Sequence, residues 1–128
     1  MKLTCVSREL HPRHAFRISR GRRTEVRNVF VRLERDGICG YGEASPNAFY
    51  EETWEGVMDK IEDARRFITA LDLQTVAGLE ASWAQVWELV APSRAAQCAL
   101  DVAMWDWLAR RRGEIGRASC RERVCLAV

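Results

Sequence analysis

Two hydrophobic periods divide the chain close to residue 50. Before that point, apolar residues alternate with polar ones in short runs that are rich in β-branched side chains. A period of two is typical of half-buried strands. The alternating positions are Leu3, Cys5, Val6, Val29, Val31 and Leu33.

A turn and a third run complete the first half. The pair Asp36-Gly37 is a typical turn sequence, and Ile38–Glu43 follows it as a returning strand. We therefore expect the first 43 residues to form a three-stranded antiparallel meander. Ser19–Glu25 is expected to be an Arg-rich, Gly-containing loop between strands, and 45–47 to end the sheet.

From Thr53 the period becomes helical. Thr53 is placed to cap a first helix of about four to five turns. Pro92 ends a second helical stripe of apolar residues. Ser93 can cap a third helix, which ends with the three arginines 110–112 before Gly113. Strands followed by helices indicate an α+β domain in which a layer of three helices covers the sheet. The three stripes are Trp54, Val57, Met58, Ile61, Ala64, Ile68 and Leu71; Leu79, Trp83, Val86, Trp87 and Val90; and Ala96, Ala99, Leu100, Ala103 and Trp107.

Composition bounds the class of protein. The 128 residues are 48% hydrophobic and 30% charged, which suits one soluble globular domain. No apolar run approaches the roughly 18 residues of a membrane span, and charges interrupt Met1–Leu10 where a signal peptide would be apolar. We therefore expect a cytoplasmic protein whose scattered, odd-numbered cysteines are free thiols. These are Cys5, Cys39, Cys98, Cys120 and Cys125.

The net charge of +2 conceals an asymmetry. Arg8–Arg35 holds nine arginines and three glutamates, whereas Asp36–Asp106 holds thirteen acids and four bases. A basic segment can attract nucleic acid, but this one is interleaved with strand-forming residues and lacks an aromatic stacking series. We expect neither a nucleic acid nor a membrane as partner.

Several residues could carry chemistry. His11 and His14 are separated by a proline-containing loop and lack further ligands, so a metal site is not expected there. Asp101 and Asp106 lie about 140° apart on a helix, which favours structural hydrogen bonding over a shared proton or metal. Gly40–Gly42 ends a strand and lacks the helix that a phosphate-binding loop needs, so it favours tight packing.

The loop Ser19–Thr24 is the strongest binding candidate. Several guanidinium groups on a turn that contains Gly21 could grip a carboxylate through paired hydrogen bonds. The alternative is a solvated basic loop, which is what most charge runs are. The residues themselves leave these two interpretations evenly balanced.

Four segments, in this order and spacing, resemble a known family. Phe16–Gly21, Val29–Val31, Gly40–Pro46 and Ala99–Asp106 are similar to the N-terminal domain of the muconate-lactonizing branch of the enolase superfamily. The resemblance covers about residues 1–114. Within the branch, the arginine loop and the stretch from Pro46 to Tyr50 look most like L-Ala-D/L-Glu dipeptide epimerases.

The resemblance implies a capping domain that closes over a (β/α)7β barrel. Two mobile loops of such a domain sort substrates, and they correspond here to Ile18–Glu25 and Asn47–Thr53. The resemblance places Arg23 where the family holds an arginine that faces the glutamyl end of the dipeptide, and we expect Arg22 to face solvent. The residues expected to bind substrate are Arg23, Arg20, Ile18 and Tyr50.

Chemistry in such enzymes belongs to the barrel. Family members remove the proton α to a carboxylate with barrel lysines, while Mg²⁺ on barrel carboxylates stabilises the enediolate. We therefore expect no catalytic residue and no metal ligand in this chain, an inactive isolated polypeptide, and Mg²⁺ as cofactor of the parent enzyme. Residues 115–128 show no clear period, and we expect them to be a foreign or disordered tail.

Other interpretations stay open. The parent enzyme could be a lactonizing cycloisomerase, an o-succinylbenzoate synthase or an N-acylamino acid racemase. The chain could also be a non-enzymatic α+β interaction module. For the leading interpretation the partners are a small dipeptide and the chain's own barrel domain, and the oligomeric state of the parent stays open.

Overall fold

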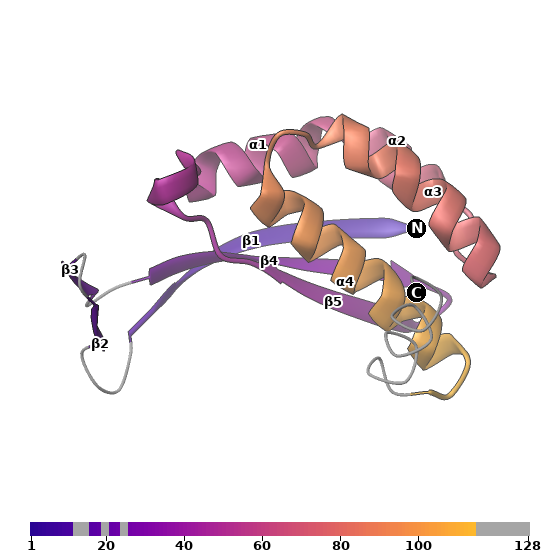
Figure 1. Ribbon diagram of the computed structural model, residues 1–128. Coiled ribbons are helices and arrows are strands. Elements are labelled where there is room, and N and C mark those ends of the chain that lie inside the picture. The colour runs from indigo at the N-terminus through magenta and orange to yellow at the C-terminus, as the bar shows by residue number, and fades with distance from the viewer. Residues whose placement is uncertain (12–15, 19–20, 24–25, 115–128) are drawn as a thin grey trace, which may run out of the picture.

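The computed structural model describes residues 1–11, 16–18, 21–23 and 26–114, with the backbone alone for 16–18 and 21–23 (Figure 1). Within these residues the strands precede the helices, as the hydrophobic pattern predicts. The strands are β1 (Lys2–Leu10), β2 (Phe16–Ile18), β3 (Gly21–Arg23), β4 (Val26–Arg35) and β5 (Ile38–Ala44). The helices are the 3₁₀ turn η1 (Ala48–Tyr50), α1 (Trp54–Asp63), α2 (Arg65–Ala70), α3 (Val76–Leu89) and α4 (Arg94–Arg111).

The main sheet is the predicted antiparallel meander. Its strand order is β1-β4-β5, with Leu3 opposite Leu33 and Val31 opposite Gly42. The turn between β4 and β5 contains Asp36 and Gly37, both at positive φ (56° and 75°), a conformation that Asp and Gly adopt more readily than most residues. The α+β fold class is therefore confirmed.

The short hairpin of β2 and β3 was not predicted. Part of the expected arginine loop is paired backbone, with Ile18 opposite Gly21 and Phe16 opposite Arg23. Three residues are too few to show an alternating pattern, so the sequence contains no periodic signal for these strands.

The helices cover one face of the sheet, and α4 lies closest to it (Figure 1). Gly40 and Gly42 of β5 face the backbone of α4, where a Cβ atom at Gly42 would overlap the carbonyl group of Ala99. The tight packing expected at Gly40–Gly42 is therefore confirmed. The largest fully buried side chains are Trp107, Leu33, Ile61, Ile68, Leu73, Leu79, Leu100, Met104, Leu108, Val29, Val31 and Val57.

Side-chain caps set the starts of the long helices. The hydroxyl oxygens of Thr53 and Ser93 accept hydrogen bonds from the first turns of α1 and α4, as the sequence predicts. Thr75 caps α3 in the same way. After α4, Gly113 lies at φ 72°, which ends the helix at the expected position.

The single helix predicted over 54–71 is wrong in one respect, because it is interrupted at Ala64. This residue has φ −80° and ψ −7° and separates α1 from α2. Arg65, the next residue, donates a hydrogen bond to the Leu3 carbonyl oxygen of β1. The apolar stripe continues across the interruption, with Ile61, Ala64 and Ile68 all buried. Hydrophobic period reports the buried face of a segment, and it does not report a local change of backbone angle.

None of the helices in the described part of the chain is long and apolar enough to cross a membrane.

Candidate functional site

The two candidate loops lie at the same end of the sheet. The hairpin precedes β4, which begins at Val26, and the segment 45–53 leaves the end of β5 at Ala44. Ala44 pairs with Val29, so the start of β4 and the end of β5 are neighbours. Figure 1 shows η1 and the β2–β3 hairpin on the same side of the molecule. We call this region the loop end.

The hairpin holds two of the four expected binding residues on paired backbone. Ile18 ends β2 opposite Gly21, and Arg23 ends β3 opposite Phe16. Arg20 lies outside the described residues. The structure therefore places the backbone of Ile18 and Arg23 at the loop end, and their role in binding stays a prediction.

The segment 47–53, which we call the aromatic loop, is a compact turn held by its own backbone. The Asn47 side chain accepts a hydrogen bond from the Phe49 N–H (3.0 Å), and the Asn47 carbonyl oxygen accepts from the Tyr50 N–H (2.9 Å). Glu51 lies in the left-handed region at φ 58°. Thr53 then begins α1 as its cap, accepting from the Gly56 N–H at 3.1 Å.

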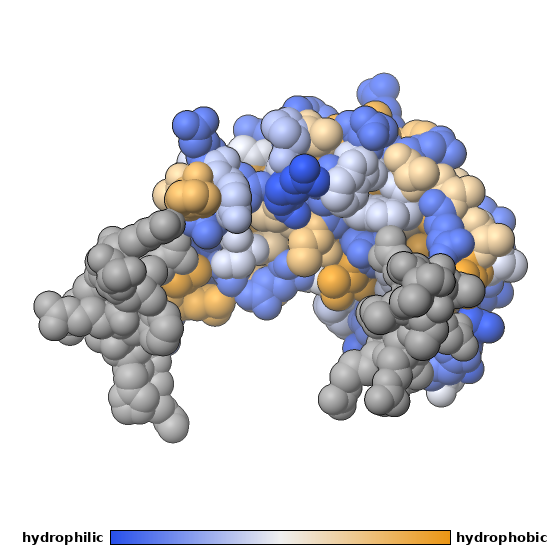
Figure 2. All heavy atoms as spheres, viewed as in Figure 1, coloured by the Kyte–Doolittle hydropathy of each residue, from blue (hydrophilic) through white to orange (hydrophobic). Residues whose placement is uncertain are grey.

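Two aromatic rings project from the aromatic loop. Phe49 is 65% exposed and Tyr50 is 63% exposed, and their rings meet edge to face with centroids 5.1 Å apart. Figure 2 shows hydrophobic surface over η1, bordered by hydrophilic residues. Exposed aromatic rings on a hydrogen-bonded turn are suited to covering an apolar part of a ligand.

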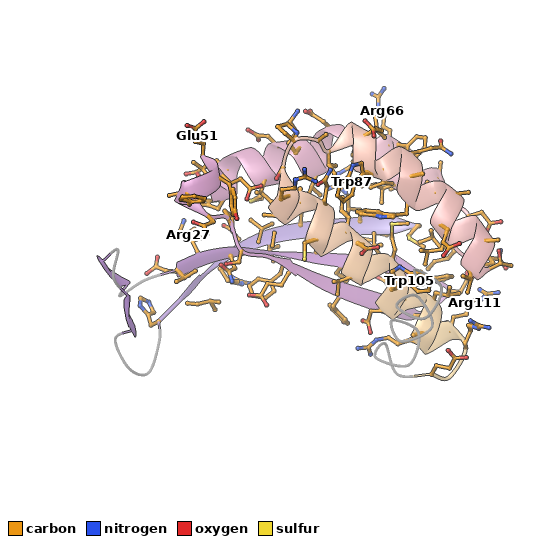
Figure 3. All side chains as sticks on the ribbon, viewed as in Figure 1. Arg27, Glu51, Arg66, Trp87, Trp105 and Arg111 are labelled. Atoms are coloured by element: carbon orange, nitrogen blue, oxygen red, sulfur yellow. The ribbon has the colours of Figure 1, made fainter. Side chains whose placement is uncertain are left out.

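An arginine lies between the two loops. The guanidinium group of Arg27 stacks over the Trp54 ring at 4.9 Å and donates to Glu9 Oε2 at 2.9 Å (Figure 3). Arg27 and Trp54 line an open pocket of about 330 Å³ that also contacts Pro46 and Glu52. The structure thus fixes one cation at the loop end.

A second open pocket, of about 320 Å³, also has Glu52 in its wall. Tyr50, Lys60 and Ser93 line it. Glu52 Oε1 accepts hydrogen bonds from Ser93 Oγ (3.1 Å) and from the Ala95 N–H (3.0 Å), both in the first turn of α4. Glu52 therefore forms part of the wall of both pockets and joins the aromatic loop to α4.

The acids and histidines considered for chemistry have structural surroundings where they are described. Asp106 Oδ2 accepts from the Tyr41 N–H and from Arg110 Nε, both at 2.9 Å, which confirms a structural role. Asp101 is half-buried on α4. His11 is exposed beside Glu9 (3.2 Å), and His14 lies outside the described residues. Among the described residues no group of three His, Cys, Asp or Glu could hold a metal ion.

The described cysteines, Cys5, Cys39 and Cys98, are all free thiols. Burial raises the pKa of the Cys5 thiol to about 11, although the nearby Arg65 guanidinium acts in the opposite direction. Arg65 also donates to both carboxylate oxygens of Glu62, and these hydrogen bonds lower the pKa of Glu62. Both groups belong to the packed sheet and helices outside the loop end, which we call the body of the domain.

Sequence reasoning missed three residues of the loop end. Phe49 had a usable signal, because it precedes Tyr50 in a segment already singled out. Arg27 had no such signal, and although Glu52 lies in the same segment, nothing in the local sequence indicates its partner. Arg27 depends on Trp54, and Glu52 depends on the first turn of α4.

With this geometry in place, the comparisons with known proteins identify the class. The α+β arrangement of a three-stranded sheet under helices is that of the enolase-superfamily N-terminal domain. Residues 1–114 match the family described as Mandelate racemase / muconate lactonizing enzyme, N-terminal domain, and the chain belongs to this family.

Two curated relatives are dipeptide epimerases of different names. The chain is 37% identical over 117 residues to the L-Ala-D/L-Glu epimerase of Escherichia coli, which covers 88% of this chain and 32% of the relative. It is also 37% identical over 100 residues to a hydrophobic dipeptide epimerase of Citrifermentans bemidjiense, which covers 77% and 26%. The chain therefore spans about a third or less of the length of these relatives.

Solved structures give the same result. One is an enolase family member from Agrobacterium tumefaciens with homology to dipeptide epimerases, crystallised with bound sodium and L-Ala-L-Glu and with an ordered loop. It is 30% identical to this chain, with a TM-score of 0.70, and the match covers 89% of this chain and 32% of that one. A dipeptide epimerase from Methylococcus capsulatus, complexed with Mg and L-Arg-D-Lys, is 25% identical, with a TM-score of 0.72 over 88% and 32%.

Proposed function

We propose that residues 1–114 form the substrate-covering domain of a dipeptide epimerase of the L-Ala-D/L-Glu type. The observation that carries the proposal is the convergence of the hairpin and the aromatic loop at one end of the sheet, in a chain whose relatives are dipeptide epimerases. In the parent reaction a base removes the proton α to a carboxylate, and the proton returns on the other face. The part of the chain described here would close over the dipeptide and exclude water.

Each side of the loop end has a distinct task in this proposal. Arg23, assisted by Arg20, pairs with the glutamyl carboxylate, because a planar guanidinium offers two parallel hydrogen bonds to a carboxylate. Tyr50 and the side chain of Ile18 contact the remainder of the dipeptide. The Arg27–Trp54 stack lies beside the aromatic loop and contributes a fixed positive charge.

The Methylococcus capsulatus epimerase was crystallised with Mg. On that ground and on the family resemblance, we assign Mg²⁺ and the acid–base groups to the barrel of the parent protein. We also place the parent enzyme in the cytoplasm, because the cysteines are scattered and the described ones are free thiols.

A second candidate is an epimerase of apolar dipeptides. The identity to the hydrophobic dipeptide epimerase equals that to the L-Ala-D/L-Glu epimerase. The exposed pair Phe49 and Tyr50 also offers apolar contact area. The two candidates differ in which group of the loop end meets the second side chain of the dipeptide, the arginines of the hairpin or the aromatic rings.

The experiment that separates them uses the full-length protein with Mg²⁺. Exchange of the α-proton in D₂O is followed by NMR for L-Ala-L-Glu, L-Ala-L-Gln and L-Ala-L-Leu. We expect L-Ala-L-Glu to have the highest kcat/KM, by about tenfold or more over the uncharged isostere, the scale of one charge-assisted contact. A preference for L-Ala-L-Leu supports the second candidate, and no exchange with any of the three contradicts both.

A further inference from the structure

Glu52 lies between the aromatic loop and α4, which are far apart in the sequence. Its carboxylate oxygen Oε1 accepts from Ser93 Oγ at 3.1 Å and from the Ala95 N–H at 3.0 Å. We propose that Glu52 is a positioning residue that locks the aromatic loop, and with it Phe49 and Tyr50, onto the first turn of α4. We call the two hydrogen bonds from Ser93 and Ala95 to Glu52 the lock. The effect of the lock on substrate binding rests on the function proposed above, whereas its effect on the loop does not.

The first turn of α4 favours a carboxylate at this position. The first N–H groups of a helix have no partner within the helix, and they carry a partial positive charge. Ser93 Oγ satisfies the Ala96 N–H at 3.2 Å, whereas the Ala95 N–H is satisfied by Glu52 from another segment of the chain. A hydrogen bond to an ionised acceptor is roughly twice as strong as a neutral one.

The contact is also shielded from water. Ser93 is 8% exposed and Ala95 is 7% exposed, and Glu52 itself is half-buried. Hydrogen bonds in such surroundings compete less with solvent, so their loss is felt more strongly than at an open surface. Glu52 therefore anchors the loop more firmly than the exposed ion pairs elsewhere on the surface can.

The lock controls the aromatic rings through a short and well-defined backbone. Two peptide bonds separate Tyr50 from Glu52, and between them Glu51 holds a left-handed turn at φ 58°. The Glu52 N–H also donates to the Asn47 carbonyl oxygen at 3.3 Å, which closes the loop on itself. A compact turn moves as one piece, so releasing the Glu52 carboxylate frees both rings together.

Glu52 also lines both pockets of the loop end. One pocket contains Arg27 and Trp54, and the other contains Tyr50 and Lys60. If the carboxylate leaves α4, the distance between the aromatic rings and the Arg27–Trp54 stack is no longer fixed. In a dipeptide epimerase this change weakens the hold on the substrate and leaves the acid–base groups of the barrel untouched.

Matched variants separate positioning from simple helix capping. Glu52→Ala removes the lock. Thr75→Ala removes the cap of α3, where Thr75 Oγ1 accepts from Gly78 at 3.0 Å, and so costs stability without affecting the lock. Glu51→Gln removes the same charge one residue earlier, from a side chain that points away from the body of the domain (Figure 3).

The test is made on the full-length protein with two measurements. Hydrogen–deuterium exchange followed by mass spectrometry reports on residues 47–53 and on the first turn of α4. We expect Glu52→Ala to speed exchange there about tenfold or more, the scale of losing a charge-assisted hydrogen bond. Thr75→Ala and Glu51→Gln should leave this exchange at the parent rate.

The second measurement is steady-state epimerisation of L-Ala-L-Glu. For Glu52→Ala we expect KM to rise roughly fivefold or more while kcat changes less than about twofold, because binding is lost and chemistry is kept. Thr75→Ala and the distant Glu80→Gln serve as kinetic controls. If Glu52→Ala does not fold, Glu52→Gln, which keeps the shape and loses the charge, should give smaller changes in the same direction.

The outcomes are distinct. If residues 47–53 exchange at the same rate in the Glu52 variants as in Thr75→Ala, Glu52 does not hold the loop and the proposal is overturned. Faster exchange of the loop with unchanged KM overturns its role in holding substrate. If the parent protein epimerises no dipeptide, the proposed function fails, and the exchange measurement still decides whether Glu52 holds the loop.

Discussion

The body of the domain and its loop end are built on different principles. In the body, α4 packs so closely on β5 that Gly42 leaves no room for a Cβ atom, and Trp107 and Leu100 are fully buried. At the loop end, the rings of Phe49 and Tyr50 are about two-thirds exposed on a turn held by short hydrogen bonds. The difference indicates that the buried contacts that stabilise the fold lie in the first region, and under the proposed function the second supplies exposed side chains for recognition.

The sharpest test of this separation is Arg23→Ala in the full-length protein. We expect the transition-state stabilisation calculated from kcat/KM for L-Ala-L-Glu to fall by about 2 to 4 kcal/mol, because a substrate carboxylate is left poorly paired in a closed site. The free energy of unfolding should change by less than about 0.5 kcal/mol, because we propose a role for Arg23 in binding and none in the core. Kinetics and urea unfolding of the same preparation measure both quantities.

Arg22→Ala is the internal control, since it removes the same charge from the neighbouring residue of β3. L-Ala-L-Leu is the control substrate, and its kcat/KM should fall much less. Equal losses for the two dipeptides, or equal losses in the two variants, would mean that the hairpin is only a solvated basic turn.

The converse substitution is made in the body. Gly42→Ala forces a Cβ atom against the backbone of α4, and because neither backbone can yield alone we expect a loss of about 3 kcal/mol, the upper end of overpacking costs. Gly56→Ala in α1 is the matched control, where the new Cβ meets only Thr53 Oγ1 at 3.3 Å. It should change stability by about 1 kcal/mol or less. A tolerated Gly42→Ala would contradict the close packing of α4 on β5.

Cysteine reactivity gives a smaller contrast within the body. With a pKa raised to about 11, Cys5 holds roughly a hundredfold less thiolate at pH 8 than an unperturbed thiol. We therefore expect iodoacetamide to label Cys5 at least about tenfold more slowly than exposed Cys98, as peptide mapping by mass spectrometry would show. In urea the two rates should converge, and equal rates in the folded protein would contradict the burial of Cys5.

The same shift has a consequence for stability at high pH. The pKa of Cys5 is higher in the folded protein than its ordinary value of 9.0, so the folded state binds the proton more tightly. The stabilisation that comes from this tighter proton binding is fully present below pH 9 and is lost as the pH rises toward about 11. Cys5→Ser should flatten the fall in stability over this range, which urea titrations at successive pH values would measure.

The smallest effect is expected from deletion of 115–128, which the family match of 1–114 does not include. The free energies of unfolding of residues 1–114 and of the 128-residue chain should differ by less than about 0.5 kcal/mol. A loss of more than about 2 kcal/mol, the scale of a substantial core truncation, would show that these residues belong to the fold.

Most of the body could be predicted because the hydrophobic pattern of each strand and helix lies within its own segment of the chain. Alternating residues gave β1, β4 and β5, and the helical stripes ending in Trp107 gave the covering layer, with Thr53 and Ser93 marking two of its helix starts. The interruption at Ala64 could not be predicted, because hydrophobic period is unaffected by one altered backbone angle.

The loop end was predictable only through its resemblance to a family. Charge and glycine content singled out the hairpin, but three-residue strands such as Phe16–Ile18 are too short to show a period. The tie from Glu52 to Ala95 joins residues 43 positions apart, and nothing in the local sequence of either segment indicates it. Contacts of this kind become visible only once the chain is folded.

The central claim is that the loop end covers a dipeptide, and a crystal structure of the full-length protein with L-Ala-L-Glu tests it most directly. We expect the glutamyl carboxylate to lie within about 3 Å of the Arg23 guanidinium, the distance of a charge-assisted hydrogen bond, and the Tyr50 ring to contact the dipeptide. A dipeptide bound with no contact from 16–23 or from 47–53 would contradict it.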